Sequence, residues 1–192
     1  MEPTRSGPSF EVKNIVTYFG LGTRNIDLHL LGRSIPHSRV ITGRFNTLVC
    51  ARLYDSDTVK FWVYTTGKVI QTGVSLRGSY GSAKEFVLCL RQCGYAASLV
   101  RFRVANVVRS ANLGFSIGLG QLYLKHSSYC SYNPEKFPGL KYKIEARNGE
   151  SFTLTIFSNG QVNLLCKRVE DEYARNIIRM MMPHFEHCRI AQ

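Results

Sequence analysis

Two aspartates one residue apart, Asp55 and Asp57, are the first candidates for chemistry in this 192-residue sequence. Paired carboxylates can hold Mg²⁺ for cleavage of a phosphodiester bond. The stretch Asp55-Ser56-Asp57 also has the composition of a tight turn between two strands. We therefore expect a turn here and not a nuclease centre, and we assign no catalytic residue.

A second cluster, His184, His187 and Cys188, carries the side chains that bind zinc. The sequence holds no matching pair of cysteines or histidines at zinc-finger spacing. Cys89 and Cys93 lie four residues apart on an expected helix, where thiols usually pack inward. The sequence thus predicts neither a metal nor a cofactor.

The charge balance indicates a polyanionic partner. Lys and Arg number 25 against 13 Asp and Glu, and 10 Tyr and 11 Phe accompany them. This combination favours nucleic acid, and the alternative is a basic surface without a special role. The hydrophobic share of 44% is that of a folded protein. No apolar run has the length of a membrane span, and no signal-peptide pattern opens the chain, so we expect a soluble intracellular protein.

The chain contains an internal duplication. The pattern F-x-V-x-N-[IV]-V occurs at Phe10 and again at Phe102, 92 residues later. Phe45 and Phe137 keep the same offset, and Tyr64 and Phe157 follow at 93. Repeats of this length indicate two similar subdomains. We therefore expect a tail over residues 1–9 and repeats over 10–97 and 98–192.

Each repeat shows the periodicity of a strand, a helix, three strands and a closing helix. The order predicts an α+β fold, with an antiparallel sheet covered by helices on one face. In the first repeat we expect a helix over 25–33, capped by Asn25 or Thr23, and a strand over 44–53. In the second, we expect the closing helix of 170–182 to end at Pro183.

The strand alternation leaves one sheet face uncharged and largely apolar. It carries Asn14 and Val16 in the first copy, and Asn106 and Val108 in the second. Ile70 and Thr72 share it on another strand. If the helices cover the opposite face, this one is open to a binding partner. The alternative is that it packs into the core.

The sequence resembles the core domain of the TATA-binding protein family, as a divergent member or a related factor. The resemblance covers roughly residues 10–190. It depends on the duplicated N-[IV]-V strands, on residues 132–140 (Y-N-P-E-K-F-P-G-L) and on residues 156–160 (I-F-S-N-G). It implies a saddle of two pseudo-symmetric repeats, a curved antiparallel sheet with helices on its convex face.

The resemblance also implies how this face meets DNA. Two aromatic wedges per repeat insert between base steps of the minor groove: Phe45 with Tyr64, and Phe137 with Phe157. Base contacts fall on Asn14, Val16, Ile70, Thr72, Asn106, Val108, Asn163 and Leu165. Phosphate contacts fall on Arg44, Lys68 and Lys143.

Partner contacts are implied in the same way. The loop with Glu135 and Lys136 corresponds to the surface that recruits transcription factor IIB. Lys136 replaces a leucine and Asn133 an acid, which should weaken docking of a partner that reads acidic groups. The first loop, Thr42-Gly43-Arg44, lacks the family's N-P-K, which puts contact with transcription factor IIA in doubt.

Departures from the family pattern cluster around the wedges. Tyr64 stands where the family has phenylalanine, and Trp62 and Thr155 replace leucines. Asn163 and Leu165 replace valine and threonine. These changes predict an altered base preference and two repeats that are no longer equivalent.

The function we expect is that of a non-enzymatic, nuclear transcription initiation factor. It would bind and bend promoter DNA through the minor groove and nucleate assembly of the polymerase machinery. The alternative is a saddle-fold module that binds nucleic acid or protein without bending DNA. A further alternative is the binding domain of a DNA- or RNA-processing enzyme.

Overall fold

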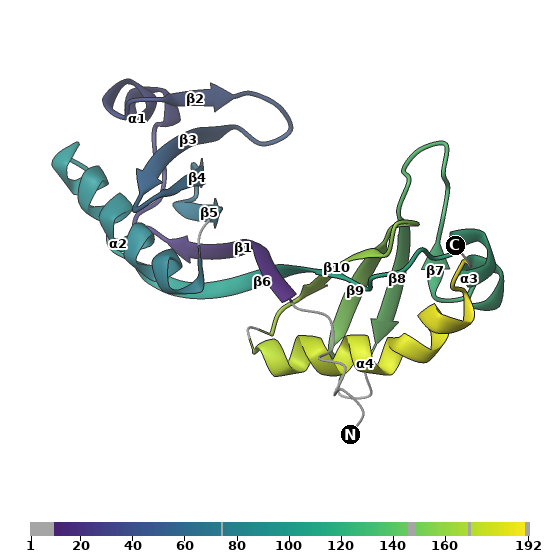
Figure 1. Ribbon diagram of the computed structural model, residues 1–192. Coiled ribbons are helices and arrows are strands. Elements are labelled where there is room, and N and C mark those ends of the chain that lie inside the picture. The colour runs from purple at the N-terminus through teal and green to yellow at the C-terminus, as the bar shows by residue number, and fades with distance from the viewer. Residues whose placement is uncertain (1–9, 74, 146–148, 169, 191–192) are drawn as a thin grey trace. The chain divides into compact units, whose positions relative to one another are not determined.

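The computed structural model describes residues 10–73, 75–145, 149–168 and 170–190. The expected tail, residues 1–9, lies outside them. The described chain forms ten strands and four helices (Figure 1). The strands are β1 (Phe10–Gly20), β2 (Ser38–Ile41), β3 (Thr47–Tyr54), β4 (Asp57–Tyr64), β5 (Lys68–Thr72), β6 (Val100–Asn112), β7 (Cys130–Ser131), β8 (Leu140–Glu145), β9 (Ser151–Ile156) and β10 (Gln161–Cys166). The helices are α1 (Leu28–Ser34), α2 (Leu76–Gln92), α3 (Leu119–Lys125) and α4 (Asp171–His187).

The chain forms two compact units. The first unit is Asn14–Asn106, and the second is residues 107–192 together with 1–13. The strand order is β2-β3-β4-β5-β1 in the first unit and β6-β10-β9-β8-β7 in the second. Each strand of the second order corresponds to one of the first, which agrees with a duplicated α+β architecture. The repeat boundaries of 10–97 and 98–192 stay a prediction.

The core of the first unit lies between its sheet and α2. Phe61 on β4 stacks on Phe86 of α2, with ring centroids 4.1 Å apart and an interplanar angle of 9°. Alternate residues of β1, namely Ile15, Thr17 and Phe19, are buried. The other β1 face is therefore the one that α2 leaves uncovered.

The second unit repeats this arrangement with α4. The buried residues of α4 recur at helical spacing, as expected for a helix with one face on a sheet. They are Ala174, Ile177, Ile178, Met181 and Phe185. They pack with the inward residues of β8, β9 and β10, such as Leu154 and Leu164.

The expectation that the last helix ends at Pro183 is wrong. Pro183 lies inside α4, which continues to His187. A proline within a helix removes one backbone hydrogen bond and costs about 3 kcal/mol. Phe185 and Cys188 beyond it are buried in the core of the second unit. Their burial offsets the cost of the proline.

Two further local expectations need correction. The strand expected over 44–53 begins only at Thr47, so Arg44 and Phe45 lie in the preceding loop. The short edge strands β2 and β7 were not expected. They have four and two residues, too few for a periodic signal.

The cap of α1 is Asp27, not Asn25 or Thr23. Its Oδ1 accepts hydrogen bonds from the backbone N–H groups of His29 (2.9 Å) and Leu30 (3.0 Å). Asn25 has a positive φ of 57° and lies before the helix. The bonds from Leu30 and His29 lower the pKa of Asp27.

This cap predicts a pH-dependent stability. A carboxyl group whose pKa is lowered by folding stabilises the fold fully above its unfolded pKa of about 4. That contribution is lost as the pH falls through the lower folded-state value. We expect Asp27→Asn to keep the cap but to flatten the fall in Tm between pH 6 and pH 3, as measured by calorimetry. Asp27→Ala should lower Tm by about 2–4 °C at pH 7. Equal pH profiles for the wild type and Asp27→Asn would contradict this assignment.

None of the helices in the described part of the chain combines the length and apolar character needed to cross a lipid bilayer.

Candidate functional site

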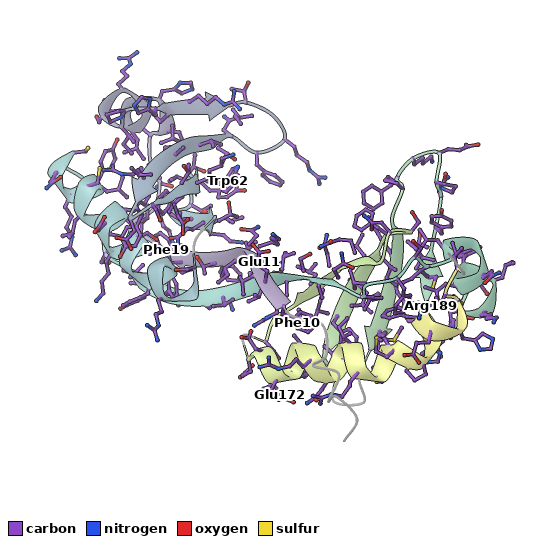
Figure 2. The ribbon with its side chains drawn as sticks, in the orientation of Figure 1. Phe10, Glu11, Phe19, Trp62, Glu172 and Arg189 are labelled. Atoms are coloured by element: carbon purple, nitrogen blue, oxygen red, sulfur yellow. The ribbon has the colours of Figure 1, made fainter. Side chains whose placement is uncertain are left out.

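The candidate site of the first unit is the sheet face that α2 does not cover. We call it the first open face. Its residues alternate with the buried ones, and strand pairing sets them side by side: Val16 opposite Thr72, Tyr18 opposite Ile70, and Ile70 opposite Trp62. All are half-buried. Figure 2 draws these side chains and labels Trp62 among them.

Asn14 is oriented by a hydrogen bond. Its Oδ1 accepts from the backbone N–H of Gly73 at 3.0 Å. Its Nδ2 has no partner in the described chain, so the amide keeps two N–H donors for an external acceptor. Asn106, its counterpart in the duplication, is also half-buried and belongs to the same compact unit. Both asparagines therefore keep part of their surface exposed, and no helix of the described chain buries them.

The sequence interpretation did not place Tyr18 and Lys60 on the first open face, and it named Trp62 only as a departure from the family pattern near the wedges. Lys60 and Trp62 alternate with the buried Val59, Phe61 and Val63, and that alternation alone could have placed them outward. The ring of Tyr18 lies between two cations, with Lys68 Nζ 5.3 Å and Arg103 Cζ 4.2 Å from its centroid. This face is therefore more basic than the sequence suggested.

The second unit has an open face of its own, on the side of its sheet away from α4. Two cross-strand rows run along it. The first row joins Ser110, Asn163, Thr155 and Lys141, and the second joins Val108, Leu165, Thr153 and Lys143. We call this the second open face. The expected residues Asn163, Leu165 and Val108 all lie on it.

Two lysines border the second open face. Lys143 was expected from the sequence, and its Nζ donates to Glu145 Oε1 at 2.7 Å. This hydrogen bond lowers the pKa of Glu145. Lys141 was missed, and its Nζ lies 5.8 Å from the centroid of the Phe137 ring.

The two wedge candidates of the second unit, Phe137 and Phe157, are in contact with each other. Phe137, which is 41% exposed, meets the half-buried Phe157 edge to face, with centroids 5.9 Å apart at 65°. In the first unit Phe45 is 71% exposed, with Arg44 Cζ 5.6 Å from its ring centroid. Within the described chain no ring contact joins Phe45 to Tyr64. The two pairs are therefore not equivalent.

The absence of a side chain at Gly139 allows the rings of Phe137 and Phe157 to pack against the backbone there. A Cβ at this position would lie 2.7 Å from Phe137 Cε1 and 3.1 Å from Phe157 Cε1. We expect Gly139→Ala to force the two rings apart while the strands beside them stay paired. Loss of the ring-to-ring nuclear Overhauser effect between Phe137 and Phe157, with unchanged far-ultraviolet circular dichroism, would show it. Retention of that effect would contradict the prediction.

The loop before Phe137 presents the expected partner residues. The backbone N–H groups of Lys136 and Phe137 both donate to the carbonyl of Asn133, at 3.1 and 3.0 Å. Glu135 and Lys136 are exposed at the tip of this turn. Their side chains are thus available to a partner.

The other candidates for chemistry are accounted for by packing and turns. Asp55 occupies the two-residue turn between β3 and β4 with a φ of 51°, and Asp57 begins β4. The imidazole rings of His184 and His126 pack edge to face, with centroids 4.6 Å apart. Cys188 is buried. Burial lowers the pKa of His126. The described residues contain no cluster of three or more potential metal ligands.

Comparisons with known proteins agree with this architecture. A family model described as "Transcription factor TFIID (or TATA-binding protein, TBP)" matches residues 101–187. The TATA-box-binding protein of Acanthamoeba castellanii is 30% identical over 162 residues, which are 84% of this chain and 60% of that protein. The TATA-box-binding protein of Acetabularia peniculus is 28% identical over 171 residues, 88% of this chain and 86% of that protein. This chain therefore spans less than two thirds of the first relative's length.

A solved structure matches as well. "Methanococcus jannaschii TBP" superposes with a TM-score of 0.72 and 23% identity, over 94% of this chain and 99% of that one. The match confirms the fold class expected from the sequence, an α+β fold with a duplicated antiparallel sheet.

Proposed function

Because the chain belongs to the TATA-box-binding protein family, a family of general transcription factors, we propose that it binds promoter DNA through the minor groove and bends it. The observation that carries the proposal is an uncovered sheet face in each unit, made largely of apolar and uncharged polar side chains, with aromatic residues and lysines on it or beside it. A sheet face of this kind suits the floor and the walls of a groove.

The proposed base contacts follow from the donor pattern of the minor groove. A·T pairs offer only acceptors there, whereas guanine adds an amino group. Asn14, with its oxygen engaged by Gly73, can donate to adenine N3 or thymine O2. Val16, Val108 and Leu165 contact the groove floor without offering an acceptor to guanine. These apolar contacts therefore favour A·T steps.

The aromatic residues act as wedges in this proposal. Phe137 and Phe157 present adjoining rings beside the second open face, and Phe45 projects from its loop. Flat apolar rings can enter between base pairs and unstack them, which kinks the duplex. Lys68, Lys143 and Arg44 supply the attraction to phosphate that does not depend on sequence.

We propose that the base preference differs from that of an ordinary family member. The first open face carries Trp62 and Lys60 at its centre, and no ring contact joins its wedge candidates Phe45 and Tyr64 in the described chain. The second open face has an assembled pair. Two unequal halves favour an asymmetric site over a uniform A·T run.

The proposed setting is the nucleus, where the DNA-bound protein starts polymerase assembly without catalysis. The exposed turn with Glu135 and Lys136 is the candidate surface for a partner of the transcription factor IIB type. The loop over 42–44 is the corresponding candidate for a partner of the transcription factor IIA type.

A bending assay tests the proposal. Duplexes labelled with a donor and an acceptor dye at their ends would be titrated at one fixed salt concentration, with TATA and non-TATA sequences compared. Binding with increased energy transfer supports the proposal. Binding without any change in transfer would support the alternative, a module that does not bend DNA. Selectivity equal to that of an ordinary family member would refute the altered preference.

Tyr64→Phe tests whether the hydroxyl of Tyr64 weakens DNA binding by opposing insertion of the ring between base pairs. A buried hydroxyl without a hydrogen-bond partner costs about 1–3 kcal/mol. We expect the variant to bind a TATA duplex about 5- to 100-fold more tightly and to bend it more. Tyr80→Phe, which removes a hydroxyl from an exposed tyrosine of α2 in the same unit, away from the open face, is the control. No gain in affinity for Tyr64→Phe would mean that Tyr64 is not inserted.

A further inference from the structure

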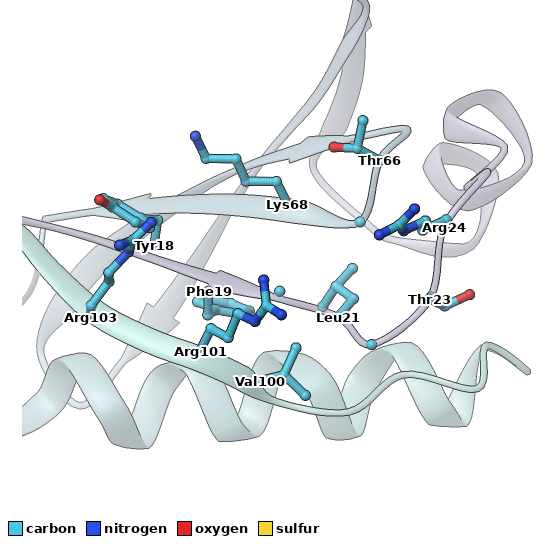
Figure 3. A pocket seen from close by; sticks show the side chains of 13 residues that line it. Tyr18, Phe19, Leu21, Thr23, Arg24, Thr66, Lys68, Val100, Arg101 and Arg103 are labelled. Carbon is cyan, nitrogen blue, oxygen red and sulfur yellow. The ribbon is translucent and has the colours of Figure 1, made fainter.

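A basic cleft lies in the first unit, at the end of β1. Its volume is about 510 Å³, and its walls come from the end of β1, the loop after it, the turn between β4 and β5, and the start of β6. Four cationic side chains line it: Arg24, Lys68, Arg101 and Arg103. Figure 3 shows Arg24 and Arg101 pointing toward the middle of the cleft.

The charge of this cleft is not compensated. No Asp or Glu lines it, and none of its four cations forms an ion pair with a described residue. Arg101 also has a positive φ of 54°, a backbone conformation that is unfavourable for arginine. Like charges gathered around a cavity repel each other, so the arrangement favours an anionic ligand.

The cleft is continuous with the first open face. Tyr18 and Lys68 belong to both. The turn that forms one wall is tied to the wedge candidate Tyr64, because the backbone N–H of Gly67 donates to the Tyr64 carbonyl at 2.9 Å. A duplex opened at Tyr64 would thus lead its backbone past this turn and into the cleft.

The duplication shows that the fold does not require these cations. The second unit builds the equivalent junction with the same backbone bond: Leu113 N–H to Gly160 O at 3.0 Å, against Leu21 N–H to Gly67 O at 2.8 Å. At the equivalent positions Ser116 replaces Arg24, and Gln161 replaces Lys68. Arg103 likewise corresponds to Glu11. Arg24, Lys68 and Arg103 therefore have no basic residue at the corresponding positions of the second unit.

We propose that this cleft binds the sugar-phosphate backbone of the DNA flank beyond Tyr64, and that it does so on one side of the complex only. The inference rests on the proposed function and deepens it. A guanidinium group offers parallel N–H donors that match two phosphate oxygens, and Arg24 and Arg101 supply two such groups. The ligand is a phosphate backbone, so the contact carries no base preference. It makes the footprint asymmetric and gives the bound protein one orientation.

The test uses the full chain with Arg24→Gln and Arg101→Asn combined. Asparagine is chosen at position 101 because it tolerates the positive φ. The matched control is Arg33→Gln with Arg77→Gln, which removes two exposed arginines from helices of the same unit. Affinity is measured from 50 to 200 mM salt on a duplex with long flanks, and hydroxyl-radical footprints are recorded on both strands.

We expect the cleft variant to lose about tenfold in affinity and its plot of log K against log salt to be shallower by about 1.8, at about 0.9 for each phosphate contact. Protection from hydroxyl radicals should be lost on one DNA flank only, while the DNA bend angle stays that of the wild type. The control variant should match the wild type. Arg24→Lys with Arg101→Lys should keep the slope, because it keeps the charge.

Other outcomes overturn the inference in distinguishable ways. If the cleft variant bends DNA as the wild type does and its plot of log K against log salt has the wild-type slope, the cleft does not bind DNA, while the proposed function still stands. An equal loss in the control variant means that total charge, not the cleft, is responsible. Binding of poly-glutamate, an acidic peptide, is measured in parallel. If the cleft variant loses this binding while the salt dependence of its DNA binding is unchanged, the ligand of the cleft is an acidic protein. A wild type that does not bind DNA would refute both proposals.

Discussion

Phe137→Ala combined with Phe157→Ala is expected to remove most of the DNA bend and to weaken DNA binding by at least about 30-fold. Each ring stacked on a base contributes about 1–3 kcal/mol, so two rings contribute about 2–6 kcal/mol. The rings adjoin each other edge to face, and their contact exists before DNA binds. Little ordering of these side chains is then needed on binding, and most of the stacking free energy contributes to affinity.

The measurement is energy transfer across an end-labelled duplex, together with a titration at one salt concentration. Leu124→Ala is the control, because Leu124 is a 79% exposed apolar residue of the same unit on α3, away from the sheet face. Its affinity and bend should equal those of the wild type. If the double variant kept the wild-type bend, the rings would not be wedges and the alternative without bending would be favoured.

Phe86→Ala is expected to lower the free energy of unfolding by about 3–5 kcal/mol. Phe86 is 1% exposed and stacks on Phe61, so its removal leaves a cavity between α2 and the sheet. The stack also holds β4, the strand that carries Trp62 and Tyr64 on its other face. We therefore expect the variant to weaken DNA binding as well, at temperatures near its lowered Tm.

Leu88→Ala is the matched control for Phe86→Ala. Leu88 lies on the same helix two residues away and is 53% exposed. A surface substitution of this kind changes stability by at most about 0.5 kcal/mol. Urea unfolding followed by circular dichroism compares the two variants. Equal losses would mean that α2 packs on the sheet through a different face.

The sequence was most informative where a pattern repeats over many residues. The alternation of β1 correctly separated Asn14 and Val16 from the buried Ile15 and Thr17. The duplication predicted that both units have a similar succession of strands and helices, as they do. These features depend on periodicity and on offsets, which are properties of the sequence itself.

Local boundaries were less predictable. The cap of α1 fell on Asp27 because its side chain reaches two free backbone N–H groups, although Asn25 is an equally suitable residue type. Pro183 did not end α4, because the burial of Phe185 beyond it outweighs the lost hydrogen bond. In both cases competing local preferences are similar in free energy, and packing decides between them.

The order of amino acids alone determined the fold class, the duplicated strand pattern and the largely apolar character of one sheet face, since each follows from the residue types and their periodicity along the chain. Only the tertiary structure decided that Phe137 and Phe157 meet edge to face while no ring contact joins Phe45 to Tyr64 in the described chain, and that four cations line one cleft. The reason is physical: alternation gives the side of a strand on which a residue lies. Proximity between side chains far apart in the sequence depends on strand register, loop path and the backbone conformation of residues such as Arg101.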